Sequence, residues 1–224
     1  MWHQEIESFL KSIGLRQSTM EPNPYMSSTV LLLLYVDDIL LAYKSLKDIL
    51  SVKAKLKERY RMTDLGPVWR FLGLDIENHG SGYALHQATY IDTMLKRHGM
   101  QDAAEADSPI DRNVILEITK DDQDCPADHK EYLAVVGSLM YASLGGRPDI
   151  SYAVALLSRL NIDPRTRHLM AAKCVLRYLK RTKCLRLVYT SGDLHGYVDA
   201  DHANGKSKKS VGGYIFLLDG AAIS

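Results

Sequence analysis

The sequence predicts an α+β fold, because segments with helical periodicity and segments with strand periodicity follow one another in separate groups. Apolar residues recur at helical spacing from Trp2 to Ile13, and Gly14 follows as a stop signal. Two short, branched and apolar runs are separated by a two-residue break, which is typical of a β-hairpin; they lie at 30–36 and 39–43. Beyond Lys183 the apolar period changes to two, so we expect the chain to end in strands.

The elements between these segments follow from the same patterns. We expect a helix at 46–60, a strand at 69–77, a turn at 78–82, a partner strand at 83–86 and a helix that closes at Gly99. The acidic stretch 101–131 contains two prolines and is expected to be a linker.

Three helices and then three strands complete the chain. The helices are predicted at 132–144, 149–160 and 164–181, and the strands at 185–189, 194–199 and 211–218. In the helix 164–181, Asp163 is the expected N-cap and Pro164 the expected first residue. A turn is predicted after the last strand, at Asp219-Gly220.

The composition is typical of a soluble globular protein, with 46% hydrophobic and 25% charged residues. No apolar run reaches the roughly 20 residues that cross a bilayer, and the acidic N-terminus is unlike a signal peptide. The three cysteines, Cys125, Cys174 and Cys184, have no spacing that indicates a disulfide framework or a zinc site. We therefore expect an intracellular chain that is neither secreted nor inserted in a membrane.

The net charge of +1 hides a local asymmetry. Ten acids and three bases lie in 101–131, whereas eleven bases and three acids lie in 165–209. The basic stretch suits a polyanionic partner such as a nucleic acid. A solvated helix face explains the same charges equally well, so charge alone leaves both interpretations open.

Two adjacent carboxylates, Asp37 and Asp38, interrupt the apolar hairpin. Carboxylates held together on a rigid support repel one another, and cations offset that repulsion. Hard oxygen ligands suit Mg²⁺, and two such ions about 4 Å apart can activate an attacking hydroxyl and stabilise a leaving phosphate oxygen. The plain alternative is that both aspartates simply solvate an exposed turn, and the pair taken alone favours that alternative.

Tyr35-Val36-Asp37-Asp38, the motif YVDD, resembles the polymerase-site hairpin of reverse transcriptases. The wider sequence is similar to the Pol polyprotein of copia-type LTR retrotransposons, in the family's order and over nearly the whole chain. The segments that carry this similarity are MTDLGPVWRFLGLDI (62–76), HQATYIDTML (86–95), VGSLMYASLGGRPDISYAVALLSR (136–159), HLMAAKCVLRYLKRTK (168–183) and GYVDADHANGKSKKSVGGYIFLLDGAAIS (196–224). YVDD alone is moderately specific, and the ordered set is strongly so.

The resemblance implies roles for several residues. Asp37 would ligate the catalytic metals directly, Asp38 would support it, and Tyr35 and Val36 would lie close to the primer terminus. Further nucleic-acid contacts would come from a primer-gripping strand and turn and from a basic helix, at Phe71, Leu72, Gly73, Lys53 and Lys57. A solvated face explains the two lysines equally well. The implied cofactor is Mg²⁺, with Mn²⁺ as a possible substitute.

The end of the chain is similar to the opening of a ribonuclease H domain. There Asp199 matches a metal ligand on the first strand, and Asp201 is a weaker candidate because alternation puts it on the same face. The resemblance implies four parts. These are a partial palm with the YVDD hairpin and the primer-grip-like strand (1–77), a thumb-like hairpin, helix and acidic linker (78–125), a helical connection (126–190) and a truncated start of the ribonuclease H domain (191–224).

The resemblance also implies that parts of both active sites lie outside this chain. The third polymerase carboxylate would precede Met1, and the remaining ribonuclease H acids would follow Ser224. Because oriented charge supplies most of the catalysis in phosphoryl transfer, the chain alone should be nearly inactive. We therefore expect a fragment of an RNA-directed DNA polymerase, with two alternatives: a non-catalytic nucleic-acid-binding remnant or domesticated module, and a truncated reading frame without a selected function.

The implied partners are an RNA–DNA or DNA template–primer, the deoxynucleoside triphosphate of the intact enzyme, and the rest of the Pol polyprotein. The replication of such elements would place the parent protein in cytoplasmic virus-like particles or in the nucleus.

Overall fold

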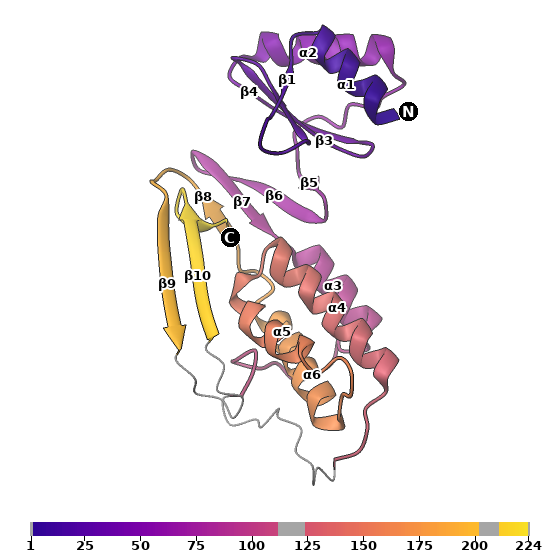
Figure 1. Cartoon of the computed structure of the whole chain (residues 1–224), viewed down its shortest axis with the longest axis vertical. Helices are drawn as coiled ribbons and strands as arrows, with labels where there is room; N and C mark the ends of the chain where they lie inside the picture. The colour runs from indigo at the N-terminus through magenta and orange to yellow at the C-terminus, as the bar shows by residue number, and fades with distance from the viewer. Residues whose placement is uncertain (1, 112–123, 202–210, 224) are drawn as a thin grey trace. The chain divides into compact units, whose positions relative to one another are not determined.

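The computed structural model describes residues 2–111, 124–201 and 211–223 (Figure 1). Within these ranges the chain forms six α-helices and three antiparallel sheets, which confirms the predicted mixture of helices and strands. The chain divides into two compact units, Met1–Val68 and Trp69–Ser224. In the described part, no helix combines the length and the apolar character that crossing a membrane requires.

The first unit is a four-stranded sheet with two helices on one face (Figure 1). The strands follow chain order: β1 (Arg16–Gln17), β2 (Pro24–Met26), β3 (Val30–Tyr35) and β4 (Asp38–Tyr43). The helices are α1 (Trp2–Ser12) and α2 (Leu46–Arg59), close to their predicted bounds. Ile6, Leu10 and Leu56 from these helices pack in one buried cluster with residues of β3.

Side chains alternate along β3 between the helix-covered face and the open face of the sheet. Val30, Leu32 and Leu34 are buried, whereas Leu31 and Tyr35 are exposed. Paired residues on neighbouring antiparallel strands share a face, so Asp38, which pairs with Tyr35, also belongs to the open face.

The tip of the β3–β4 hairpin lies one residue earlier than the sequence predicts. The sequence predicts the break at Asp37-Asp38, but the structure pairs Tyr35 with Asp38, so Val36 and Asp37 form the turn. The physical reason is burial: pairing Leu34 with Ile39 keeps both on the face that packs against the helices, and a one-residue slip would expose them.

The second unit begins with another sheet, in the order β5 (Arg70–Phe71), β6 (Leu74–His79), β7 (Gly82–His86) and β8 (Leu187–Tyr189). The predicted single strand at 69–77 is wrong, because Leu72 and Gly73 form a tight turn between β5 and β6. Both residues have positive φ, 49° and 79°, and a strand cannot continue through that conformation.

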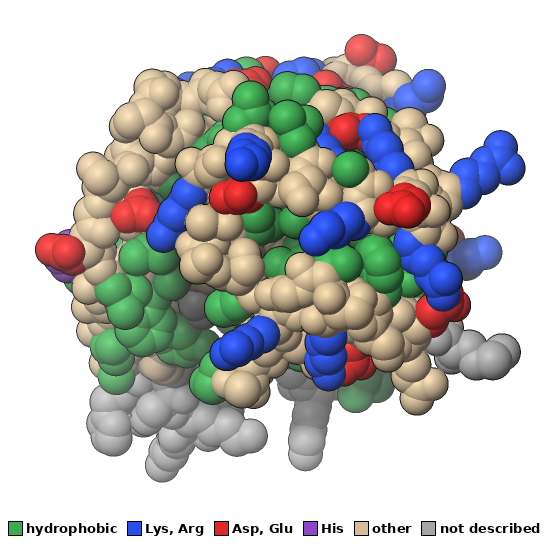
Figure 2. Space-filling view, turned by 90° about the horizontal axis from the view of Figure 1, so that it is seen from above, with side chains coloured by type: hydrophobic (Ala, Val, Ile, Leu, Met, Phe, Trp, Pro, Cys, Tyr) green, Lys and Arg blue, Asp and Glu red, His purple; other side chains and the backbone are tan. Residues whose placement is uncertain are grey.

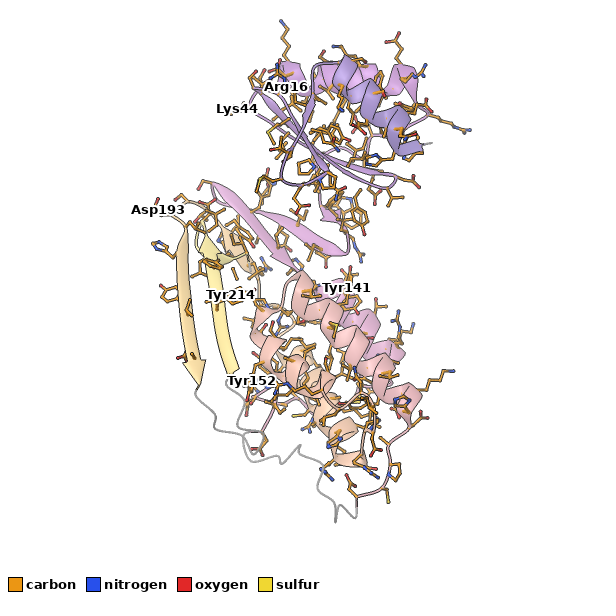
Figure 3. All side chains as sticks on the ribbon, in the orientation of Figure 1. Arg16, Lys44, Tyr141, Tyr152, Asp193 and Tyr214 are labelled. Carbon is orange, nitrogen blue, oxygen red and sulfur yellow. The ribbon has the colours of Figure 1, made fainter. Side chains whose placement is uncertain are left out.

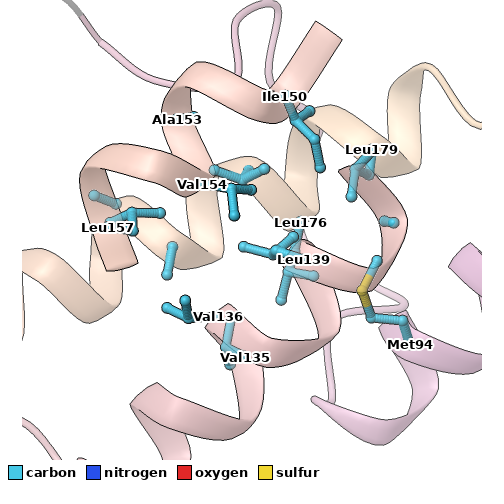
Figure 4. Close-up of a cluster of buried hydrophobic side chains, with 14 of the residues drawn as sticks. Met94, Val135, Val136, Leu139, Ile150, Ala153, Val154, Leu157, Leu176 and Leu179 are labelled. Carbon is cyan, nitrogen blue, oxygen red and sulfur yellow. The ribbon is translucent and has the colours of Figure 1, made fainter. Parts of the chain in front are cut away.

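Four helices form the main core of this unit: α3 (Ala88–Arg97), α4 (His129–Gly145), α5 (Ser151–Ser158) and α6 (Thr166–Arg181). A 3₁₀ turn at Pro148–Ile150 precedes α5. Their apolar faces meet in the cluster drawn in Figure 4, which includes Met94, Leu139, Leu157 and Leu176.

The predicted start of α6 is wrong by two residues. Arg165 is the N-cap and the helix begins at Thr166. The carboxylate of Asp163, the expected N-cap, instead accepts a hydrogen bond from the Arg165 guanidinium at 2.7 Å. The Asp163 carboxylate, which the sequence predicts as the acceptor for the first N–H groups of the helix, is therefore bonded to Arg165.

A three-stranded sheet ends the chain, in the order β11 (Ala221–Ala222), β10 (Val211–Leu218) and β9 (His195–Asp201). The predicted turn at Asp219-Gly220 is present, and both of its residues have positive φ, 53° and 89°. The Tyr189 hydroxyl donates a hydrogen bond to the Ala222 carbonyl at 2.6 Å, which joins the end of β8 to β11.

The acidic and basic stretches that the sequence separates bond largely to one another. Each of the eight bases between 165 and 186 has an ion pair or a hydrogen bond to an acid or to a backbone carbonyl. Arg181 pairs with Asp107, for example, and Lys173 with Glu131. Three of the eleven bases, at 206–209, lie outside the described residues.

Candidate functional site

The YVDD motif occupies the tip of the β3–β4 hairpin. Val36, the first residue of the turn, has φ of 53°, whereas the φ of Asp37 is not positive. A β-branched residue in the left-handed region is a strained outlier, since glycine is favoured there. Strain of this kind costs about 1–3 kcal/mol and is concentrated at functional sites, which directs attention to this turn.

The two motif carboxylates are exposed at the tip. Within the described residues, neither the Asp37 carboxylate nor the Asp38 carboxylate has a side-chain hydrogen bond or an ion pair, although the Asp38 backbone pairs with Tyr35 in the β3–β4 ladder. Two adjacent, unpaired negative charges repel one another, and a bound cation would relieve that repulsion.

The donor chemistry of these carboxylates fits a hard divalent cation such as Mg²⁺ or Mn²⁺, but only in part. Mg²⁺ takes six oxygen ligands, commonly one or two carboxylates with water and substrate phosphates. The described ranges contain no group of three or more His, Cys, Asp or Glu side chains placed to hold a metal. Asp37 and Asp38 could therefore supply two of the ligands, and others would have to come from elsewhere.

A pocket of about 380 Å³ lies beside the hairpin tip. Its lining combines aromatic, apolar and neutral polar side chains: Trp2, His3, Asn23, Leu34, Tyr35 and Val36. The indole Nε1 of Trp2 donates a hydrogen bond to the Val36 carbonyl at 3.2 Å, which joins the start of α1 to the strained turn. No lysine or arginine is among these lining residues.

The two lysines of α2 that are candidates for contacting phosphates, Lys53 and Lys57, both pair with a carboxylate of the same unit. Lys53 Nζ lies 3.0 Å and Lys57 Nζ 3.4 Å from the Asp64 carboxylate. The bond from Lys53 is the largest cause that lowers the pKa of Asp64, from 3.8 to about 2. On the face seen in Figure 2, blue lysine and arginine side chains alternate with red acidic ones instead of forming one basic patch.

The second unit holds Phe71, Leu72 and Gly73. Leu72 and Gly73 form the turn between β5 and β6, and the Tyr141 hydroxyl of α4 donates a hydrogen bond to the Leu72 carbonyl at 3.0 Å. Figure 3 labels Tyr141 on α4. A Cβ at position 73 would clash with this hydroxyl, so the close approach that glycine allows here is made by the chain's own Tyr141.

A groove of about 530 Å³ adjoins this turn, and Arg70, Gly73, Tyr90, Arg97 and Tyr141 contribute to its lining. Arg70 lies 3.8 Å from Asp75, whereas Arg97 has no ion-pair partner within the described residues. Burial, together with the charge of Arg97, lowers the pKa of His98. The groove thus presents cationic and tyrosine side chains in one place.

The candidate ribonuclease H ligands lie on β9 of the second unit. Asp199 is exposed, and its Oδ1 accepts a hydrogen bond from the backbone N–H of the next residue, Ala200, at 2.9 Å. Asp201 ends the strand, and its side chain lies outside the described residues.

Several residues around these sites cannot be found from local patterns. Trp2 contacts Val36, Asp64 pairs with Lys53, and Tyr141 holds Leu72. The partners lie 11 to 69 positions apart in sequence, and periodicity carries no information on such pairs.

Comparisons with known proteins agree with these features. The family model described as reverse transcriptase (RNA-dependent DNA polymerase) matches residues 1–112. The retrovirus-related Pol polyprotein from transposon TNT 1-94 of Nicotiana tabacum is 35% identical over the whole chain, which spans 18% of that polyprotein. The corresponding polyprotein from transposon RE1 of Arabidopsis thaliana is 33% identical, and the chain spans 16% of it.

A shorter relative is covered over most of its length. The putative transposon Ty5-1 protein of Saccharomyces cerevisiae is 36% identical over the whole chain, which covers 75% of that protein. No solved structure matches the chain. On the family model and these relatives, and in keeping with its resemblance to copia-type elements, the chain belongs to the reverse transcriptase (RNA-dependent DNA polymerase) family.

Proposed function

We propose that this chain is a segment of a retrotransposon RNA-directed DNA polymerase, and that its YVDD hairpin contributes two carboxylates to the metal site. The observation that carries the proposal is the hairpin tip. A strained Val36 fixes a turn that bears two adjacent carboxylates without protein partners in the described part of the chain. A turn that merely solvates the chain has no need of that strain.

In this role the residues of the hairpin have different functions. Asp37 and Asp38 offer anionic oxygen ligands, and the two-residue turn holds them on a rigid ladder. Tyr35 shares the open sheet face with Asp38 and borders the primer end of a bound template–primer. A bound Mg²⁺ or Mn²⁺ supplies the positive charge that stabilises the negative charge of phosphoryl transfer.

We further assign the parts of the chain by the family resemblance. Residues 1–77 correspond to part of the palm, 78–125 to a thumb-like part, 126–190 to the connection and 191–224 to the start of a ribonuclease H domain with Asp199 as a metal ligand. The sheet with two covering helices in the first unit and the helical core of the second support this assignment. The partners of the active enzyme are a template–primer, a deoxynucleoside triphosphate and the remaining Pol polyprotein.

Primer extension tests the catalytic part of the proposal. Two carboxylates make an incomplete two-metal site, so the 224-residue chain should add no nucleotide by itself. Supplied with a separately expressed N-terminal part of a related Pol polyprotein, it should extend a primer, and Asp37→Asn should abolish that extension. Extension that survives in Asp37→Asn would refute the role of this carboxylate, and Glu21→Gln, an exposed acid in the same unit, is the matched control.

A second candidate function is nucleic-acid binding without catalysis. The groove lined by Arg70 and Arg97 favours it, because Arg97 has no carboxylate partner among the described residues and adjoins two tyrosines. Binding of an RNA–DNA hybrid should weaken steeply with salt if phosphate contacts dominate. Arg97→Gln should reduce both the affinity and the salt slope, while Arg159→Gln, an exposed arginine on another helix end, should change neither.

A further inference from the structure

The pocket beside the hairpin tip has the chemistry of a nucleobase site. Its volume of about 380 Å³ is within the range of small-ligand pockets, and Trp2 and Tyr35 place two aromatic rings on its lining. No side chain of the lining carries a fixed positive charge, so the pocket does not suit a phosphate. Planar, uncharged bases stack well on such aromatic side chains.

Trp2 is held in place before any ligand arrives. Its indole Nε1 donates to the Val36 carbonyl at 3.2 Å, and its ring meets Tyr60 edge to face at 5.2 Å between centroids. Tyr60 in turn packs edge to face on Phe9 at 5.3 Å. Trp2 nevertheless remains 41% exposed, so part of its surface is available to a ligand. A fixed aromatic surface binds with little loss of side-chain entropy.

Asn23 supplies a polar group suited to the edge of a base. Its backbone carbonyl accepts a hydrogen bond from Leu34 N at 3.0 Å, which fixes the residue next to β3. Its side-chain amide has no hydrogen bond to the described residues, and it offers both donors and an acceptor. An amide of this kind can pair with the donor and acceptor groups on a base edge.

We propose that this pocket receives an unpaired nucleobase of the template–primer, with Trp2 as the stacking surface and Asn23 as the edge contact. The inference rests on the proposed function, because it is the YVDD hairpin that brings nucleic acid to this place. Tyr35 and Val36 belong to both the pocket and the motif, so the base would lie directly beside the carboxylates. Trp2 and Asn23 would then position the strand on which the hairpin acts.

Tryptophan fluorescence reports on this pocket directly. The chain has two tryptophans, and Trp69→Phe leaves Trp2 as the only one. A DNA template–primer with a 5′ single-stranded overhang should quench the emission of Trp69→Phe in a saturable manner. An otherwise identical template–primer with abasic overhang positions keeps every phosphate and should fail to quench.

Affinity measured by fluorescence anisotropy of labelled template–primer gives the second readout. Trp2→Ala should raise the dissociation constant at least about fivefold, since base stacking on an aromatic side chain has an effect of that order. Asn23→Ala keeps the backbone bond to Leu34 and should weaken binding by a smaller factor. Trp69→Phe is the matched control and should bind like the parent chain.

The outcomes separate this inference from the proposed function. Equal quenching by the abasic template–primer, or unchanged affinity in both Trp2→Ala and Asn23→Ala, would overturn the base pocket and leave nucleic-acid binding by the chain intact. If the circular dichroism spectrum shows that Trp2→Ala does not fold, the affinity of Asn23→Ala and the response to the abasic template–primer test the base pocket instead. An absence of binding by the parent chain would overturn both the pocket and the proposed function.

Discussion

Tyr35 lies directly opposite Asp38 in the β3–β4 ladder, so the two side chains share the open face of the sheet. The same pairing leaves Val36 and Asp37 as a two-residue turn, with Val36 at a φ of 53°. The YVDD motif therefore has two distinct parts: a cross-strand pair, Tyr35 with Asp38, on the open face and a strained tip that carries the Asp37 carboxylate.

Replacing Val36 with glycine should stabilise the first unit. Glycine adopts positive φ without strain, so Val36→Gly should raise the free energy of unfolding by about 1 kcal/mol. The measurement is urea unfolding followed by circular dichroism. Val36→Ala retains a Cβ and keeps most of the strain, so it is the matched control. If Val36→Gly is no more stable than Val36→Ala, the valine is not strained at this tip.

The pairing of Lys53 with Asp64 should make the first unit sensitive to acid. The pKa of Asp64 is lowered from 3.8 to about 2 in the folded state, so its contribution to stability is present above pH 3.8. That contribution is lost as the pH falls from 3.8 towards 2. The melting temperature of Asp64→Asn should therefore fall less over this interval than that of the parent chain. Identical pH profiles for the two proteins would show that the ion pair adds nothing.

Replacing Gly73 with alanine should destabilise the second unit for two reasons that can be separated. Its φ is 79°, and a new Cβ would clash with the Tyr141 hydroxyl. Gly99 in the same unit is the matched control, because its φ is 63° and a Cβ there meets nothing. We expect Gly99→Ala to lower the free energy of unfolding by about 1 kcal/mol, from backbone strain alone. Gly73→Ala should cost more, and adding Tyr141→Phe should recover part of the difference. Equal losses of unfolding free energy at both positions would contradict a clash between the new Cβ and the Tyr141 hydroxyl.

The buried Arg147 should be the most sensitive polar residue of the helical core. It is 1% exposed, pairs with both carboxylate oxygens of Asp149 at 2.9 and 2.7 Å, and donates to the Thr182 carbonyl at 3.2 Å. Arg147→Met removes the guanidinium from these acceptors, leaves Asp149 with the Tyr178 hydroxyl as its side-chain donor, and should cost about 3–5 kcal/mol of unfolding free energy. Arg147→Lys should rescue little, since a lysine cannot make the two parallel bonds. Arg159→Met, at an exposed site, should stay within about 0.5 kcal/mol. A cost below about 1 kcal/mol for Arg147→Met would contradict the importance of this network.

Local periodicity predicts those elements whose burial repeats regularly. Helix α1 and the core helices follow apolar spacing that ordinary packing preserves, and the turn at Asp219-Gly220 follows from glycine's freedom at positive φ. The motif YVDD is itself local, so the candidate carboxylates could be identified from the sequence together with the family resemblance.

The remaining features depend on contacts that no local pattern encodes. The hairpin register is decided by which residues pack under α1 and α2, and this moves the tip from Asp37-Asp38 to Val36-Asp37. The turn at Leu72-Gly73 is held by Tyr141, 69 residues later. Likewise, the basic stretch suggests a site for a polyanion when the sequence is read alone. In the structure, bases of this stretch pair with acids such as Asp107 and Glu131.

Asp37 and Asp38 should ligate a divalent cation, and a titration with Mn²⁺ measures that binding. Electron paramagnetic resonance can follow free Mn²⁺ during titration of the chain with a template–primer present. We expect a binding site whose affinity falls about tenfold or more in Asp37→Asn, because one anionic ligand is lost, and stays unchanged in Glu21→Gln. An affinity that is the same in the parent chain and in the double variant Asp37→Asn/Asp38→Asn would contradict the claim.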